Sequence, residues 1–159
     1  MKKLLAWMLN NIMMNQTSSK KTSRRRRSRH VAMQALYQWQ FNQLSATELV
    51  HEFLTNEDTP KVDQDYFSKL VVGTIEHLAE IDSVVSTKLD RRINELNPVE
   101  LAILRVATYE LKYQMEIPYR VVINEALEVA KCYGSEEGHK YINGVLDTLA
   151  KDLRSIEMT

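Results

Sequence analysis

The sequence of 159 residues has few of the residues that make tight turns or cross-links: four glycines, three prolines and one cysteine, Cys132. So few glycines and prolines argue against a turn-rich β architecture, whereas Leu, Ala, Glu, Lys, Arg and Gln, which favour helices, are common. A single cysteine excludes an internal disulfide framework and fits a reducing compartment, which predicts a cytoplasmic protein. The composition therefore predicts an all-α chain, and its length is sufficient to bury a hydrophobic core.

Acidic residues are absent before Glu48, whereas nine Lys or Arg residues occur there. The whole chain has 21 basic and 21 acidic residues, so the part from Glu48 onward holds twelve basic and twenty-one acidic ones. A formal net charge of zero thus combines a first part of +9 with a remainder of −9. Such an asymmetry is typical of a basic arm for nucleic acid or a membrane on an acidic body.

Residues 1–23 form an extension that differs from the rest of the chain. Its basic start and apolar run resemble a secretory signal, but Asn10 and Asn11 interrupt the run and no small-residue cleavage site follows. The run is also shorter than the about 20 apolar residues that span a bilayer, which excludes a membrane span. We expect a flexible extension, either a short amphipathic appendage or the product of an upstream start codon, with Met13 and Met14 as other possible starts.

The first predicted helix runs from Arg24 to Phe41 and has two apolar stripes. One stripe has the spacing of a core-facing helix surface and consists of Ala32, Ala35, Leu36 and Trp39. The other lies well round the helix, so a single core cannot easily bury both; it consists of Met33, Tyr37 and Phe41. We expect this second stripe to be exposed and to bind a protein partner, either a different protein or a second copy of the chain in a homodimer.

Six further helices are predicted from apolar periodicity and cap signals. Asn97, Pro98 and Glu100 form a helix start of N-cap, first-turn proline and acid, and Pro118 ends that helix. Gly73 falls inside a helix at a cost of about 1 kcal/mol, which indicates a close crossing with another helix. The single helical domain, residues 24–154, then has halves of about 24–80 and 81–154, with the six helices near 45–56, 63–78, 81–89, 98–117, 119–133 and 135–153.

Catalytic motifs are missing: there is no glycine-rich phosphate loop, no serine elbow and no H-E-x-x-H. Glu48-x-x-His51 and Glu136-x-x-His139 share the spacing of the Glu-x-x-His pairs in di-iron helix bundles. However, Ser45 and Glu48 have the spacing of a capping box, and Glu136 lies in a first helical turn, where acids are common. We expect no catalysis, no metal and no cofactor, and a di-iron enzyme remains the minor alternative.

Five arginines open the first helix: Arg24, Arg25, Arg26, Arg27 and Arg29. They point all round the helix, which excludes a dry interior and predicts that they face water or a polyanion. His30 and His77 are expected to be surface or hydrogen-bonded side chains. A helical DNA-binding or architectural protein is an alternative to an RNA-binding one, although a compact helix-turn-helix signature is missing.

Four blocks of the sequence stand out, in order between about Arg24 and Leu153. They are V-A-M-Q-A-L-Y-Q-W-Q after the arginines, N-P-V-E-L-A-I-L-R-V-A-T-Y-E-L, I-P-Y-R-V-V-I-N-E-A-L-E-V-A-K and G-S-E-E-G-H-K-Y-I-N-G-V-L-D. In these blocks the chain resembles the NusB family of transcription antitermination factors. The resemblance implies a compact seven-helix fold in two halves. It also implies binding of a single-stranded RNA element, boxA, in ribosomal RNA leaders together with the ribosomal protein NusE, in a transcription elongation complex with other Nus factors.

The resemblance also assigns residues to these roles. It implies RNA backbone contacts by Arg24 to Arg27, Arg29 and Lys140, base stacking by Tyr141 in place of the more usual Phe, and a protein-partner face that includes Tyr37 and Glu100. Glu136 and Glu137 match an acidic pair that limits RNA affinity by repelling phosphate. Asn143 is a candidate for base contacts, and we expect the arginines and Lys140 to form one basic track. The alternatives are that Tyr141 is a half-buried core aromatic and Asn143 a surface polar residue.

Overall fold

A computed structural model of the chain describes residues 20–132 and 136–158. The first described helix, α2 (Lys20–Asn42), includes the last four residues of the predicted extension, and the rest of that extension lies outside the described residues. α2 is followed by α3 (Ala46–Thr55), α4 (Gln64–Glu76), α5 (Leu78–Ser86), a 3-10 turn η1 (Ile93–Glu95), α6 (Pro98–Tyr113), α7 (Tyr119–Lys131) and α8 (Glu136–Leu153). The described part of the chain therefore confirms an all-α fold with seven α-helices.

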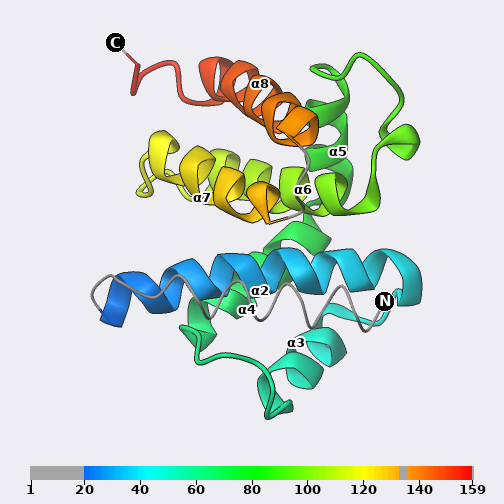
Figure 1. Ribbon diagram of the computed structural model, residues 1–159, viewed down its shortest axis with the longest axis vertical. Helices are drawn as coiled ribbons and strands as arrows, with labels where there is room; N and C mark the ends of the chain where they lie inside the picture. Colours follow the sequence, from blue (N-terminus) through cyan, green and yellow to red (C-terminus); the bar gives the residue numbers. More distant parts are fainter. Residues whose placement is uncertain (1–19, 133–135, 159) are drawn as a thin grey trace.

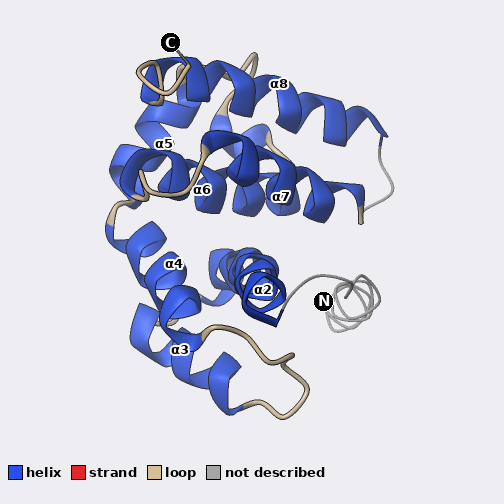
Figure 2. Cartoon of the chain, turned by 90° about the vertical axis from the view of Figure 1, so that its left-hand side faces the viewer, coloured by secondary structure: helices blue, strands red, loops and turns tan. Residues whose placement is uncertain are grey.

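The helices form two halves that are stacked along the long axis of the molecule (Figure 1). α3 and α4 lie in one half, and α5 to α8 lie in the other. α2 lies at the junction, because it packs against α4 on one side and against α6 and α7 on the other (Figure 2). None of the helices that the structure describes is long and apolar enough to cross a membrane.

Local signals in the sequence set two helix starts. The Ser45 hydroxyl accepts a hydrogen bond from the Glu48 backbone N–H, and the Glu48 carboxylate accepts one from the Ser45 N–H, both at 3.2 Å. The Asn97 side chain accepts from the Val99 N–H at 2.8 Å, just before the first turn of α6. These caps satisfy backbone donors that have no partner within their helix, and both were predicted.

The predicted close crossing at Gly73 is confirmed. A Cβ atom on Gly73 in α4 would lie 2.2 Å from Cζ of Tyr109 in α6, closer than real Cβ atoms approach another atom. The absent side chain therefore lets α4 and α6 meet. Trp39, predicted for the core, is half-buried against it, and its indole N–H donates to the Leu44 carbonyl at 2.8 Å.

Arg154 connects the end of α8 to the end of α6. Its side chain is fully buried, and its guanidinium donates at 2.7–3.1 Å to four backbone carbonyls, those of Leu111, Ile117, Glu110 and Gln114. The last carbonyls of a helix have no partner within it, so this arginine caps α6 from outside.

Candidate nucleic-acid interface

The five predicted arginines lie on the first turns of α2 but differ in exposure. Arg24 is exposed, whereas Arg25, Arg26 and Arg27 are half-buried and Arg29 is buried. This difference follows from the position of α2 between the two halves, because each turn of the helix presents some side chains to solvent and others to α4, α6 or α7. The arginines therefore have to be considered one by one.

Arg29 forms a buried ion pair with Glu110 and is not a free cation. It is 5% exposed, and its Nε donates to both carboxylate oxygens of Glu110, at 2.9 and 3.0 Å. The Tyr66 hydroxyl donates to the same carboxylate. Burial opposes the charge on Arg29, but the Glu110 carboxylate raises the pKa of Arg29 above its ordinary value. The prediction that all five arginines face water or a polyanion is wrong for Arg29, because α6 supplies a buried counter-ion.

Arg26 is paired with α7. Its Nε donates to the Glu125 carboxylate at 3.0 and 3.1 Å, and the pair is partly buried. His30, one turn further along, places Nε2 3.9 Å from Glu125, and neither ring nitrogen has a hydrogen-bond partner among the described residues. His30 is 4% exposed, and burial, together with Arg26 and Arg29, lowers its pKa to about 4. The expectation of a surface or hydrogen-bonded His30 is therefore wrong, since it is buried and neutral.

Arg24, Arg25 and Arg27 are the arginines that stay near solvent. Arg25 lies 3.8 Å from Asp63 and above the Tyr66 ring, at 4.7 Å from its centroid. The Nε of Arg27 donates to the Lys61 carbonyl at 2.6 Å, and burial, followed by the charge of Arg24, lowers the pKa of Arg27. Arg24 is exposed and the other two are half-buried, so these three side chains border the solvent on the first turns of α2.

The predicted residues of α8 lie at its N-terminal end. Lys140 is exposed and lies 3.4 Å from Glu136 one turn earlier, and Glu137 is also exposed. Tyr141 and Asn143 are half-buried, and Tyr141 packs against the core. The position of Tyr141 is that of a half-buried core aromatic, which was the alternative, and its role in base stacking stays a prediction.

Two neighbours of Tyr141 were missed by sequence reasoning. The Tyr141 hydroxyl donates to Asp90 Oδ1 at 3.0 Å, and the Arg91 guanidinium lies 4.5 Å from the centroid of the Tyr141 ring. Asp90 and Arg91 belong to the loop between α5 and η1, 50 or more residues away from Tyr141 along the chain. No local pattern in the sequence relates this loop to α8.

The arginines of α2 and the predicted residues of α8 are separated by α7, which lies between the two helices in Figures 1 and 2. A groove of about 540 Å³ between α2 and α7 is lined by side chains of both charges, namely Arg26, His30, Val121, Asn124, Glu125, Leu127, Glu128 and Lys131. Lys131 adds positive charge to this groove, but Glu125 and Glu128 line it as well. A single basic track from α2 to Lys140 stays a prediction.

The predicted partner face is smaller than expected. Met33 is 2% exposed and belongs to the core, so its prediction as an exposed residue is wrong. The reason is that α2 is covered on two sides, by α4 and by α6, so both of its apolar stripes contact other helices. Phe41 is 54% exposed and Tyr37 half-buried, with their rings 5.2 Å apart in an edge-to-face pair.

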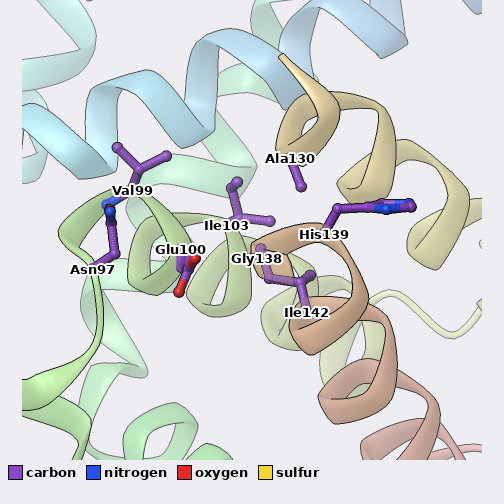
Figure 3. Close-up of a pocket in the computed structure, with 8 residues that line it drawn as sticks. All are labelled: Asn97, Val99, Glu100, Ile103, Ala130, Gly138, His139 and Ile142. Carbon is purple, nitrogen blue, oxygen red and sulfur yellow. The ribbon is translucent and has the colours of Figure 1, made fainter. Parts of the chain in front are cut away.

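Glu100 lies on the first turn of α6, beside the start of α8. It lines a pocket of about 140 Å³ together with Gly138 and His139 (Figure 3). Burial raises the pKa of Glu100, and Arg91 opposes this shift. The Gln40 side chain donates to the Pro98 carbonyl at 2.9 Å, so the start of α6 contacts the part of α2 that carries Tyr37 and Phe41.

The two Glu-x-x-His pairs do not assemble a metal centre within the parts of the chain that the structure describes. No three His, Cys, Asp or Glu side chains there are grouped as metal ligands. Glu48 acts in the cap of α3, and His51 is exposed.

Comparison with known proteins identifies the family of this chain. The sequence model of the NusB family matches residues 26–151. The chain belongs to the NusB family. The transcription antitermination protein NusB of Mannheimia succiniciproducens is 50% identical over 140 residues, which cover 88% of this chain and 98% of that protein. The transcription antitermination protein NusB of Haemophilus ducreyi is 51% identical over 133 residues, 84% of this chain and 97% of that protein.

Solved structures of NusB proteins share the fold. T. maritima NusB is 36% identical with a TM-score of 0.72, over 79% of this chain and 89% of that one. A structure of the antitermination factors NusB and NusE in complex with dsRNA is 30% identical with a TM-score of 0.68, over 80% of this chain and 96% of the matched chain. NusB proteins are antitermination factors rather than enzymes, so family membership confirms the prediction of a non-catalytic chain.

Proposed function

We propose that this NusB-family chain is an RNA-binding adaptor that binds single-stranded boxA-type leader RNA together with the ribosomal protein NusE. In this role it supports ribosomal RNA transcription in the cytoplasm, within an elongation complex that contains other Nus factors. The observation that carries the proposal is the basic surface on the first turns of α2, formed by the exposed Arg24 and the half-buried Arg25 and Arg27. The fold of the chain is that of a NusB protein whose structure was solved with NusE and dsRNA.

The RNA surface is proposed to have two parts. Arg24, Arg25 and Arg27 contact phosphates, and each contact releases condensed counter-ions, which gives salt-dependent affinity without sequence preference. Sequence preference comes from the α8 part, where Tyr141 and Asn143 lie close to Lys140. Arg26 joins the phosphate contacts through the guanidinium nitrogens that its pair with Glu125 leaves open.

The acidic pair Glu136 and Glu137 is proposed to limit RNA affinity. Both side chains are exposed on the first turn of α8, and Glu136 also neutralises part of the charge of Lys140. Replacing both with Gln should tighten RNA binding, because two like charges near phosphate are removed without a change in side-chain shape. Unchanged or weaker RNA binding by the double variant contradicts this role.

The protein-partner face is proposed to consist of Tyr37, Phe41 and Glu100. An aromatic pair with one exposed and one half-buried ring is the kind of anchor that protein interfaces use, and the half-buried carboxylate of Glu100 offers a charge nearby. A homodimer that covers the same face is the competing possibility. Measuring the molecular mass of the free protein and of its mixture with NusE distinguishes a monomer that forms a 1:1 complex from a stable dimer that excludes NusE.

The RNA proposal is tested by fluorescence anisotropy with a labelled single-stranded leader RNA, a scrambled RNA of equal length and duplexes of RNA and DNA, with and without NusE, over a salt series. We expect tighter binding of the leader RNA than of the other nucleic acids, and a further gain with NusE. Preference for duplex DNA favours the architectural alternative, and equal binding of leader and scrambled RNA with NusE present contradicts the proposal.

The salt series also tests the arginines. The triple variant R24A/R25A/R27A should reduce the slope of log affinity against log salt by about 2, at about 0.7 for each lost contact on a single strand. The matched control K69A/R120A/K151A removes the same charge from exposed positions elsewhere. It should leave the slope unchanged, and equal slopes for the two triple variants contradict a role specific to α2.

A further inference from the structure

The loop between α5 and η1 places a charged side chain beside Tyr141. Arg91 lies over the ring of Tyr141, with its guanidinium carbon 4.5 Å from the ring centroid. Its Nε and Nη2 donate to Asp90 at 2.7 and 3.3 Å, and the Tyr141 hydroxyl donates to the same carboxylate at 3.0 Å. Arg91, Asp90 and Tyr141 therefore form a closed set of contacts, the Arg91 cluster.

The position of Arg91 determines what a base can reach. Tyr141 is half-buried and packs against the core, and Arg91 covers its ring. The Arg91 side chain is 44% exposed and that of Asp90 67%, so the guanidinium over the Tyr141 ring is open to solvent with the carboxylate at its edge. A base that approaches Tyr141 from solvent therefore meets Arg91 first.

The chemistry of this surface suits a nucleobase. A guanidinium group is planar and delocalised, stacks on aromatic rings on either face, and carries N–H donors at its edge. Asp90 binds two of the guanidinium nitrogens, which holds the group over the ring without covering its outer face. Lys140 precedes Tyr141 in α8 and adds a cation nearby for a phosphate.

We propose that Arg91 is a base-stacking residue of this RNA surface: one base of the single-stranded RNA stacks on the outer face of the Arg91 guanidinium, and Tyr141 supports that guanidinium from the other side. The proposal rests on the proposed RNA-binding function. It changes the role of Tyr141, which becomes the support of the stacking group instead of its contact surface. Asp90 is a positioning residue, since it fixes the guanidinium and does not touch RNA.

Arg92 provides a matched control within the same loop. It has the same charge, is exposed and directly follows Arg91. Its guanidinium makes no ion pair and no ring contact with any residue that the structure describes, so it shares the charge of Arg91 but not the stack. A comparison of these two positions separates stacking from general attraction of RNA to a basic loop.

The test uses the full chain and a twelve-nucleotide single-stranded leader RNA in which 2-aminopurine replaces each base in turn. Lysine at position 91 keeps the charge but lacks the planar group. We therefore expect R91K to bind the RNA about tenfold more weakly, because the stacking of one base is lost. The slope of log affinity against log salt should stay unchanged, because no phosphate contact is lost. One 2-aminopurine position should be quenched by the wild-type protein and lose that quenching with R91K, while R92K behaves as the wild type.

Three results overturn the proposal. The first is an R91K variant equal to the wild type in affinity and quenching. The second is an R92K variant that loses as much affinity as R91K. The third is weaker binding by R91A only, with a lower salt slope, which identifies a phosphate contact. Thermal unfolding of R91K should match that of the wild type, since the side chain is partly exposed. If the wild-type protein does not prefer leader RNA over scrambled RNA, the proposed function itself fails. If the wild type does prefer leader RNA and R91K binds it equally well, only the stacking role of Arg91 fails.

Discussion

Replacing Arg29 with alanine should destabilise the fold severely, because it leaves the Glu110 carboxylate without its cation in the core. Glu110 is 0% exposed and receives two hydrogen bonds from Arg29. Removal of one partner of a buried ion pair typically costs 3–5 kcal/mol, which is a large part of the about 5–15 kcal/mol that stabilises a typical domain. We expect R29A to lower the free energy of unfolding by about 3–5 kcal/mol at pH 7.

The loss in R29A should depend on pH. Burial already raises the pKa of Glu110 above its ordinary value of 4.5, and Arg29 opposes that shift, so its removal raises the pKa further. A carboxyl whose pKa is higher in the folded state than in the unfolded state destabilises the fold as the pH rises above the unfolded value. The difference in stability between R29A and the wild type should therefore grow from about pH 4.5 to pH 7.

Urea unfolding followed by circular dichroism measures this loss. R24A is the matched control, because it removes the same charge from an exposed position in the same helix. We expect R24A to stay within about 0.5 kcal/mol of the wild type. The apolar replacement R29M/E110L should recover most of the stability, since a buried ion pair and a well-packed apolar pair are often equivalent. An R29A protein within about 1 kcal/mol of the wild type at pH 7 would refute the role of this pair.

Three further predictions concern stability and are measured by urea unfolding. G73A should lower the free energy of unfolding by about 1–3 kcal/mol, because the new Cβ would lie 2.2 Å from Cζ of Tyr109. G144A, whose Cβ meets nothing within 4 Å, should instead gain up to about 1 kcal/mol, and equal effects of the two changes contradict the steric reason. Because the pKa of His30 is lowered to about 4 in the fold from its ordinary 6.5, stability should fall by roughly 3 kcal/mol as the pH drops from about 6.5 to 4. H30Q should lack this part of the acid sensitivity, and an unchanged pH dependence in H30Q contradicts a buried neutral histidine. S45A should lower the free energy of unfolding by about 1 kcal/mol, because it removes the hydroxyl that caps α3. A decrease below about 0.3 kcal/mol would show that the cap contributes little.

Features encoded within a few residues were predictable from the sequence. The cap of α3 at Ser45, the start of α6 at Asn97 and Pro98, and the close crossing at Gly73 follow from the local preferences of these residues. The resemblance of four sequence blocks to the NusB family also gave the fold, since those blocks contain most of the core of α2, α6, α7 and α8.

Features that depend on the packing of distant segments were not predictable. Met33 and Arg29 are buried because α2 lies between the two halves, and a single helix pattern does not show how many of its sides will be covered. The counter-ion of Arg29 is 81 residues away along the chain, and the partner of Tyr141 lies in a loop before η1. The sequence could therefore place the basic residues on α2 but could not tell structural arginines from those available to RNA.

The proposed role of this chain in transcription through leader RNA is tested most directly by terminator readthrough in purified transcription. The reactions contain NusE and the other Nus factors, and the templates carry a boxA-type leader or a scrambled leader. We expect the wild-type chain to increase readthrough only on the leader template, and R24A/R25A/R27A to increase it much less. Equal readthrough with and without the chain on the leader template would contradict this role.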